Sequence, residues 1–197
     1  MAICIWVDCD DVISDTRSSL LKRQEFVSKW IIMEDFTTYH LKDLKKLWID
    51  AIQALQIFDC FLSSSQYFQT QPVPWAYEKL NERRNKWYKL FVVTARNEKY
   101  KDVTIKWVET YFPWIFSDYL FTTQYPNNEM LKSQLCNQKW IKLLIDDSIE
   151  NIQDINSIWI PWILLDKPRN QWMEDTNLLK RVYSRDEMDL NVFFSML

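Results

Sequence analysis

Glycine is missing from this chain of 197 residues. Average usage of about 7% predicts roughly a dozen glycines at this length. Helix ends and tight turns often need a backbone with positive φ, which glycine reaches without strain and bulky residues reach only at a cost. The missing glycines are therefore the feature of the composition that most needs an explanation.

Residues that often build metal and disulfide sites are also scarce. The four cysteines are Cys4, Cys9, Cys60 and Cys136. They stand far apart without CxxC spacing, which gives no zinc or redox motif and favours a reducing, cytoplasmic compartment. The single histidine, His40, is better explained as a structural residue than as a ligand.

Long apolar runs and an excess of positive charge are absent too. The longest apolar run, residues 158–165, contains Pro161 and is too short to span a bilayer, and the N-terminus has no basic segment followed by an apolar one. We therefore expect no membrane partner. The net charge is -3 with both signs mixed, so no basic stripe is available for duplex nucleic acid, whereas a small anionic substrate remains compatible.

What the chain does contain is a strand that ends in carboxylates. Residues 3–7 are apolar or β-favouring and lead directly into Asp8, Cys9, Asp10 and Asp11. In open α/β sheets the chemistry lies at this end of the strands. Two carboxylates spaced i and i+2 could hold Mg²⁺, or one of them could attack an electrophile. The alternative is an Asp-rich turn that only closes the strand.

Strands and helices alternate along most of the remaining sequence. Strands are expected at residues 3–7, 88–93, 119–122, 141–145 and 158–165, with an edge strand at 181–184. Helices are expected at residues 76–86, 103–112, 129–138, 149–156 and 186–197. This order predicts an α/β fold, a Rossmann-like parallel sheet flanked by helices and joined by right-handed crossovers. At 48% hydrophobic residues, the length suits a single domain over residues 1–197.

Residues 14–72 interrupt this alternation with helical spacing and almost no strand character. We expect two helices there, at residues 20–30 and 41–57, forming a small helical cap inserted after the first strand. The core would then comprise residues 1–13 and 73–197. Four aromatic residues follow the second helix: Phe58, Phe61, Tyr67 and Phe68. They could cover a ligand base, although such spacing is more typical of core packing.

Two later strands also end in polar groups. Thr94, Ala95 and Arg96 follow the second strand, and Asp146 and Asp147 follow the strand at 141–145. The threonine hydroxyl could hold a phosphate oxygen or only cap the next helix. Because the carboxyl ends of parallel strands share one edge, the four aspartates of these motifs would crowd together, and their repulsion predicts a bound cation such as Mg²⁺.

These motifs together resemble the haloacid dehalogenase-like superfamily, whose set is DxD, a Thr, a Lys on a helix, and DD. Within it the chain is similar to phosphatases of the 5'(3')-deoxyribonucleotidase type (5'-nucleotidase, cytosolic type C-like). The similar segments are WVDCDDVISDT, PVPWAYEKL, KLFVVTAR, YFPWIF, KLLIDDSIENI and LLDKP. The insert matches the helical cap of those phosphatases, and the resemblance covers the whole chain.

The resemblance implies a mechanism. Asp8 would be the nucleophile that forms an aspartyl-phosphate, and Asp10 the general acid and base. Magnesium would be held by Asp8, by the backbone carbonyl of Asp10, and by Asp146 or Asp147, with a slight preference for Asp146. The phosphate would be bound by Thr94, Ala95 and Lys132. Lys139 is the alternative to Lys132, but it stands closer to the following strand than the family's lysine commonly does.

The eleven tryptophans offer an explanation for the missing glycines. Several stand where the similar phosphatases carry glycine: Trp6, Trp75, Trp87, Trp114, Trp140, Trp159 and Trp162. Conversely, Arg169 and Arg185 stand where those relatives usually carry tryptophan. We hypothesise that the gene comes from a lineage that reads UGA as glycine, and CGA or CGG as tryptophan. The alternative is a protein that truly lacks glycine.

Substrate choice depends on the insert and its loops. Aromatic residues there, with Phe36, Tyr39 and His40, favour a nucleoside or deoxynucleoside 5'-monophosphate, while a sugar phosphate or another small phosphomonoester stays open. A non-catalytic nucleotide or phosphate sensor is the alternative of another class, although it would need neither Asp8 nor Asp10. A phosphotransferase to an acceptor other than water is a third. The sequence does not give the oligomeric state, and a homodimer stays open.

Overall fold

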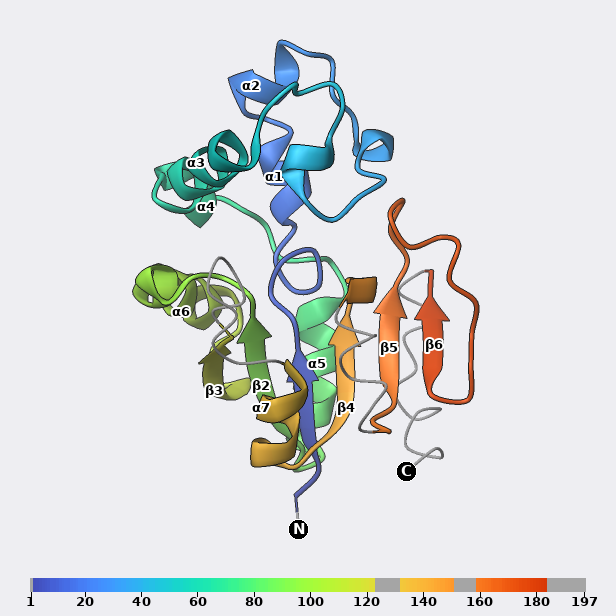
Figure 1. Cartoon of the computed structure of the whole chain (residues 1–197). Coiled ribbons are helices and arrows are strands. Elements are labelled where there is room, and N and C mark those ends of the chain that lie inside the picture. Colours follow the sequence, from blue (N-terminus) through green and yellow to red (C-terminus); the bar gives the residue numbers. More distant parts are fainter. Residues whose placement is uncertain (1, 123–131, 151–158, 184–197) are drawn as a thin grey trace.

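The computed structural model describes residues 2–122, 132–150 and 159–183 (Figure 1). Its centre is one sheet of six strands in the order β3-β2-β1-β4-β5-β6, in which every neighbouring pair is parallel. The bounds are β1 Cys4–Val7, β2 Lys89–Thr94, β3 Phe116–Phe121, β4 Ile141–Asp146, β5 Trp162–Leu165 and β6 Leu179–Val182. This confirms the parallel α/β sheet that the sequence predicts.

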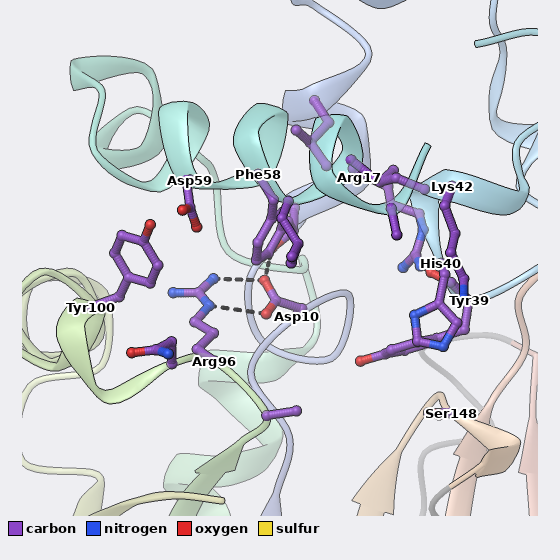
Figure 2. Close-up of a pocket in the computed structure, with 18 of the residues that line it drawn as sticks. Asp10, Arg17, Tyr39, His40, Lys42, Phe58, Asp59, Arg96, Tyr100 and Ser148 are labelled. Carbon is purple, nitrogen blue, oxygen red and sulfur yellow. Dashed lines mark hydrogen bonds and ion pairs between the residues drawn. The ribbon is translucent and has the colours of Figure 1, made fainter. Parts of the chain in front are cut away.

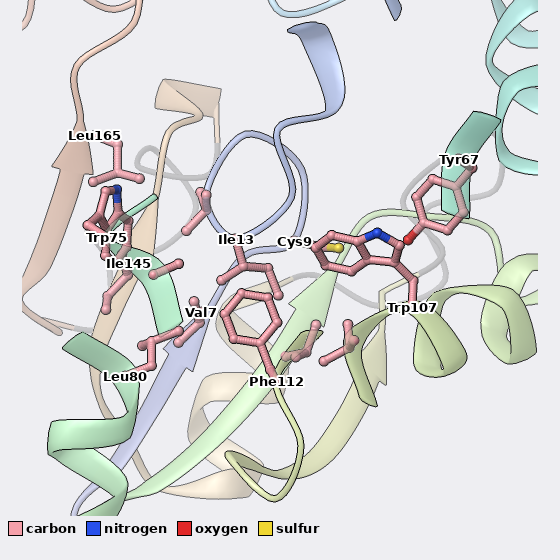
Figure 3. Close-up of a cluster of buried hydrophobic side chains, with 14 of the residues drawn as sticks. Val7, Cys9, Ile13, Tyr67, Trp75, Leu80, Trp107, Phe112, Ile145 and Leu165 are labelled. Atoms are coloured by element: carbon pink, nitrogen blue, oxygen red, sulfur yellow. The ribbon is translucent and has the colours of Figure 1, made fainter. Parts of the chain in front are cut away.

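The two faces of the sheet separate two apolar clusters. Side chains alternate along a strand, so in β1 Ile5 and Val7 join the larger cluster, whereas Cys4 and Trp6 join the smaller one. The larger cluster includes residues of α5 (Ala76–Asn85) and α6 (Lys101–Tyr111), and Figure 3 shows Leu80, Trp107 and Phe112 gathered there. Cys136 of α7 (Lys132–Lys139) lies in the smaller cluster. Helices therefore cover both faces, as doubly wound sheets require.

The chain between β1 and β2 places four helices beyond the carboxyl-terminal edge of the sheet (Figure 1). They are α1 (Thr16–Leu20), α2 (Gln24–Val27), α3 (Ala51–Leu62) and α4 (Ser65–Phe68), with 3-10 turns at η1 (Met33–Asp35) and η2 (Leu41–Asp43). We call this segment, residues 14–72, the cap.

The prediction of two long helices in the cap is wrong. The first is divided into α1 and α2, and the second into η2 and α3. Asp50 begins α3 with a capping box, in which its side chain accepts a hydrogen bond from the backbone N–H of Gln53 at 2.8 Å. Trp30, which lies after the end of α2, and Trp48, which lies between η2 and α3, adopt positive φ. Apolar periodicity alone did not reveal these interruptions.

Other expected elements differ from the structure in detail. The strand expected from residue 158 begins at Trp162, after Pro161, whose carbonyl accepts a hydrogen bond from the backbone N–H of Leu144. The edge strand lies at Leu179–Val182 rather than at 181–184. Most of the expected helix at 149–156 and all of that at 186–197 lie outside the described residues.

Six tryptophans have positive φ, and all six are exposed to solvent. They are Trp30, Trp48, Trp87, Trp114, Trp140 and Trp159. Four of them belong to the set of expected glycine positions, while Trp30 and Trp48 do not. The expectation of a glycine-like backbone is wrong for Trp6 and Trp162, which lie buried in strands, and for Trp75, which has φ of −84° before α5.

No helix among the described residues combines the length and the apolar character that crossing a membrane would take.

Candidate active site

The acidic centre of the site lies where β1 and β4 end side by side. The backbone N–H of Asp8 donates to the carbonyl of Ile145 at 2.9 Å, which continues the ladder past β1. Carboxylate oxygens of Asp8, Asp146 and Asp147 lie within 4.8 Å of one another, and all three residues are buried. The structure thus brings together three of the four aspartates expected at the cation.

The loop after β4 fixes one of these carboxylates. Asp146 Oδ1 accepts hydrogen bonds from the backbone N–H groups of Asp147, at 2.8 Å, and of Ser148, at 2.9 Å. Neither buried side-chain oxygen of Asp147 accepts a hydrogen bond within the described residues, although Arg169 is in ion-pair contact with it. Buried carboxylate oxygens without hydrogen-bond donors are what a hard cation binds.

The charge of the whole centre also favours a cation. Five carboxylates (Asp8, Asp10, Asp11, Asp146 and Asp147) and three guanidinium groups (Arg17, Arg96 and Arg169) are gathered between the sheet and the cap. With all of them ionised, two negative charges remain uncompensated. A divalent ion would neutralise them, so the residues present fit the predicted magnesium site.

Asp10 does not belong to this cluster, because its side chain turns toward β2. Arg96 donates from Nε to one Asp10 carboxylate oxygen at 2.9 Å and from Nη2 to the other at 2.6 Å (Figure 2). Thr16, the first residue of α1, donates its hydroxyl to the same carboxylate at 2.5 Å. Burial disfavours the ionised form, but the charge and hydrogen bonds of Arg96 hold the pKa of Asp10 below its ordinary value.

The guanidinium group of Arg96 also contacts two hydroxyl groups besides the Asp10 carboxylate. Its Nη1 contacts the hydroxyl of Tyr67, in α4, at 2.6 Å and that of Thr104, in α6, at 2.9 Å. The guanidinium carbon also lies 4.7 Å from the centre of the Tyr67 ring. Arg96 therefore joins the core loop after β2 to a cap helix and to Asp10.

A second arginine network joins the cap to the metal ligands. Asp11, which has φ of 60°, accepts from Arg17 through both its carboxylate oxygens, and from Arg169 Nη2 at 3.0 Å. Arg17 Nη2 in turn donates to the carbonyl of Tyr39 at 2.9 Å. Burial and the nearby charge of Arg169 lower the pKa of Arg17 to about 9.

The expected phosphate-binding residues come from two elements. Thr94 ends β2, is buried, and accepts a hydrogen bond through its hydroxyl from the backbone N–H of Arg96 at 3.3 Å. Ala95 lines the pocket described below. Lys132 begins α7, but its side chain lies outside what the structure describes. Lys139 Nζ pairs with Asp118 in β3 at 3.2 Å and is not among the described pocket residues.

A pocket of about 540 Å³ lies between the cap and the core loops, with Asp10 in its wall (Figure 2). The cap contributes aromatic and apolar side chains, including Phe58 of α3, and the core contributes Arg96 and Tyr100. His40, expected to be structural, lines this pocket, and its Nε2 lies 3.4 Å from a carboxylate oxygen of Glu150. The pocket is thus open to a ligand larger than phosphate.

The four aromatic residues of α3 and α4, Phe58, Phe61, Tyr67 and Phe68, differ in their surroundings. Phe61 and Tyr67 are fully buried, as expected for core packing, and Tyr67 packs against Trp107 with ring centres 6.1 Å apart. Phe58 instead lines the pocket, whereas Phe68 is partly exposed.

Several residues of the site were not expected from sequence. Arg96 was visible as a cation at a strand end, but nothing in the sequence placed it on Asp10. Arg169 lies far along the chain from Arg17 and Asp11, and no spacing signal connects it with them. Tyr67 matched ordinary core periodicity. The packing of the cap on the core brings Tyr67 to Arg96.

Solved structures resemble this arrangement over almost the whole chain. A haloacid dehalogenase-like family hydrolase from Streptococcus pneumoniae has a TM-score of 0.69 at 11% identity, covering 98% of each chain. A protein assigned as a phosphoglycolate phosphatase from Lactobacillus delbrueckii has a TM-score of 0.66 at 16% identity, covering 96% of this chain and 97% of its own. A magnesium-bound haloacid dehalogenase-type hydrolase from Bacillus subtilis has a TM-score of 0.57 at 13% identity, covering 95% and 96%.

By sequence alone, no protein-family model matches the chain, and no curated protein matches it. At these identities the structural likeness shows the fold. The chain therefore has the haloacid dehalogenase-like fold, the class that the four sequence motifs predicted.

Proposed function

We propose that this protein is a Mg²⁺-dependent phosphomonoester hydrolase that works through an aspartyl-phosphate on Asp8. The observation that carries the proposal is the buried carboxylate of Asp8 at the end of β1, beside Asp146 and Asp147 and below the pocket that contains Asp10. In this arrangement a nucleophile, a cation site and a proton donor would share one edge of the sheet, which supports the proposal. The structural neighbours are haloacid dehalogenase-like hydrolases, which supports the same chemistry.

The first step follows from these positions. A carboxylate oxygen of Asp8 attacks phosphorus, a new O–P bond forms, and the bond from phosphorus to the leaving oxygen breaks. In this step Asp10 acts in its protonated form: it gives its proton to that oxygen, so the alcohol leaves neutral and Asp10 becomes the carboxylate that pairs with Arg96. In the second step Asp10 takes a proton from water, the water oxygen bonds to phosphorus, and the bond to Asp8 breaks. Inorganic phosphate leaves and both carboxylates return to their starting states.

The remaining groups of the site would bind the phosphate and neutralise its charge. Thr94, the backbone at Ala95, and Lys132 would bind the phosphate oxygens. The carboxylates of Asp8, Asp146 and Asp147, with the Asp10 carbonyl, would hold Mg²⁺, which supplies charge neutralisation for the transferred phosphoryl group. Burial keeps ionised Asp8 out of bulk water, which strengthens its repulsion with a substrate dianion, so the cation and the phosphate-binding groups would have to offset that repulsion.

For the substrate we favour a nucleoside or deoxynucleoside 5'-monophosphate. The pocket volume of about 540 Å³ leaves room for a base and sugar, and Phe58 and Tyr100 offer aromatic faces. A smaller phosphomonoester, such as a sugar phosphate, is the second candidate, because the neighbour from Lactobacillus delbrueckii is assigned to phosphoglycolate. We place the enzyme in the cytoplasm, where its four free cysteines would stay reduced.

The test is release of inorganic phosphate from nucleoside and deoxynucleoside monophosphates, sugar phosphates and 2-phosphoglycolate. Each is assayed with Mg²⁺ and with EDTA, on the protein and on Asp8→Asn. Mg²⁺-dependent release that is lost in Asp8→Asn supports the phosphatase, and the ranking names the substrate class. Nucleotide binding without release would instead favour the sensor, and phosphate transfer to added glycerol the phosphotransferase.

A further inference from the structure

Arg96 lies between the cap and the proposed acid and base. Its side chain lines the pocket but is only 1% exposed, because neighbouring groups surround its guanidinium. Both oxygens of the Asp10 carboxylate are fixed by it, through the paired hydrogen bonds from Nε and Nη2. A bidentate pair of this kind sets the orientation of a carboxylate as well as its charge.

The other two guanidinium groups described at the centre pair with carboxylates other than Asp10. Arg17 and Arg169 pair with Asp11, and Arg169 also contacts Asp147. The side chain of Asp10 is 18% exposed at the pocket and stands among other carboxylates. Without Arg96 it would be repelled by those carboxylates and would keep the hydrogen bond from Thr16 but lose the bidentate pair that sets its orientation.

Tyr67 supplies the connection to the cap. It is fully buried, and its hydroxyl meets Arg96 Nη1 from α4, opposite the bonds to Asp10. Thr16, also in the cap, contacts Asp10 directly. The orientation of Asp10 therefore depends on two cap residues as well as on the core.

We propose that Arg96 is a positioning residue that holds the Asp10 carboxylate toward the leaving oxygen, and that Tyr67 fixes Arg96 when the cap is packed on the core. This rests on the proposed function. Arg96 acts only through Asp10, so its loss should matter where the leaving group needs a proton. A nucleoside leaves as a poor alkoxide, whereas p-nitrophenolate leaves readily without one.

The experiment compares single-turnover release of nucleoside from a deoxynucleoside monophosphate with release of p-nitrophenolate from p-nitrophenyl phosphate, both with Mg²⁺. We expect Arg96→Gln to slow nucleoside release about 100-fold, with KM nearly unchanged, and p-nitrophenolate release by about fivefold or less. Arg96→Lys should recover part of the loss. Tyr67→Phe should act in the same direction by several-fold. Arg84→Gln, at an exposed position of α5, is the matched control.

A double-mutant cycle separates positioning from structural damage. Arg96→Gln should add almost nothing in an Asp10→Asn background, because it acts through the group already removed. Equal slowing of both leaving groups, or additive losses in the cycle, would overturn the proposal. If the protein releases neither leaving group, the proposed function fails instead. In that case the pairing of Arg96 with Asp10 is tested by NMR, from the carboxyl ¹³C signal of Asp10. An unchanged signal in Arg96→Gln and Tyr67→Phe would refute this pairing.

A second inference rests on the backbone of the tryptophans. Trp30 and Trp87 occupy the left-handed position of a Schellman motif, because Ile31 N–H donates to the carbonyl of Phe26 and Tyr88 N–H to that of Arg83. This position is usually glycine, since a Cβ is strained there. All six tryptophans with positive φ are also between 72% and 89% exposed, although tryptophan is normally well buried.

The other tryptophans behave differently. Trp6, Trp107 and Trp162 are almost fully buried and have no positive φ. The coincidence of left-handed backbone, full exposure and missing glycine leads us to infer that positions 30, 48, 87, 114, 140 and 159 are glycine in the protein as its own cell makes it. This set differs from the one that the sequence pattern suggested.

The codons and the native protein test this inference. We expect UGA at all six positions and UGG at position 107, with tryptic peptides of the protein isolated from its own cells giving the masses for glycine. UGG codons at the six positions, or peptide masses with tryptophan there, would overturn it.

Discussion

The two edges of the sheet carry different kinds of constraint. At the carboxyl-terminal edge, β1, β2 and β4 lead into Asp8, Thr94 and Asp146, which are buried and surrounded by charges. At the opposite edge, four tight turns lead into β2, β3, β4 and β5, each with one exposed tryptophan at positive φ: Trp87, Trp114, Trp140 and Trp159.

The comparison shows that repulsion between charges and strain in the backbone occur at opposite edges of the sheet. The carboxyl-terminal edge has five carboxylates against three guanidinium groups, a repulsive arrangement that only a ligand or cation relieves. At the amino-terminal edge the cost is conformational, of the order of 1–3 kcal/mol for each strained residue. Substitutions at the first edge should change activity, and those at the second should change stability.

The largest expected effect is at the carboxyl-terminal edge. Asp8→Asn removes the proposed nucleophile while keeping the shape, so we expect kcat to fall by about 10⁴-fold or more. The Tm without Mg²⁺ should not fall, because one of several repelling carboxylates is gone. Phosphate release and thermal unfolding measure the two quantities. A large fall in Tm would show that the two edges are not separable in this way.

The next effect concerns the cation. Asp146→Asn keeps an oxygen for the backbone N–H groups of Asp147 and Ser148 but removes a charge. We expect the Mg²⁺ dissociation constant to rise by about tenfold or more, a loss of roughly 1.4 kcal/mol per decade. Titration calorimetry on the metal-free protein measures it. Glu78→Gln, an exposed carboxylate of α5, should leave the constant unchanged.

Much of the carboxyl-terminal edge could be predicted from the sequence. Strands that end in Asp8, Thr94 and Asp146 are recognised by their apolar runs, and parallel topology then forces their ends together. The side-chain pairing could not be predicted, because no spacing in the sequence places Arg96 on Asp10, and Arg96 meets Tyr67 only through the packing of the cap. The helix boundaries in the cap were also missed, because apolar periodicity did not show the interruptions between α1 and α2 and between η2 and α3.

At the amino-terminal edge the only signal in the sequence is the absence of glycine. The missing glycines pointed to turns with an unusual residue, but local sequence did not distinguish Trp87, which adopts positive φ, from Trp162, which lies within β5. Backbone conformation in a turn depends on how the following strand joins the sheet. The structure supplies that information, and residue type alone does not.

The third expected effect is therefore a gain in stability at the amino-terminal edge. Replacing the four tryptophans that precede β2, β3, β4 and β5 with glycine should raise the free energy of unfolding by roughly 1 kcal/mol per site, because each residue leaves a strained left-handed conformation. Denaturant unfolding measures the sum, and kcat should stay within twofold or so of the starting protein. Unchanged stability would mean that these turns tolerate a side chain without strain.

The smallest expected effect separates the backbone strain at a left-handed position from the effect of exposing an indole ring. At Trp140, which has φ of 55°, both Trp140→Gly and Trp140→Ala remove the exposed indole, but only glycine removes Cβ. Glycine should exceed alanine in the free energy of unfolding by about 1 kcal/mol, the reverse of their order at an ordinary position. Trp172, which is 70% exposed and has no positive φ, is the matched site, where Trp172→Gly should be no more stable than Trp172→Ala. If glycine and alanine rank alike at both sites, exposure of the ring and not the backbone explains the contrast between the two edges.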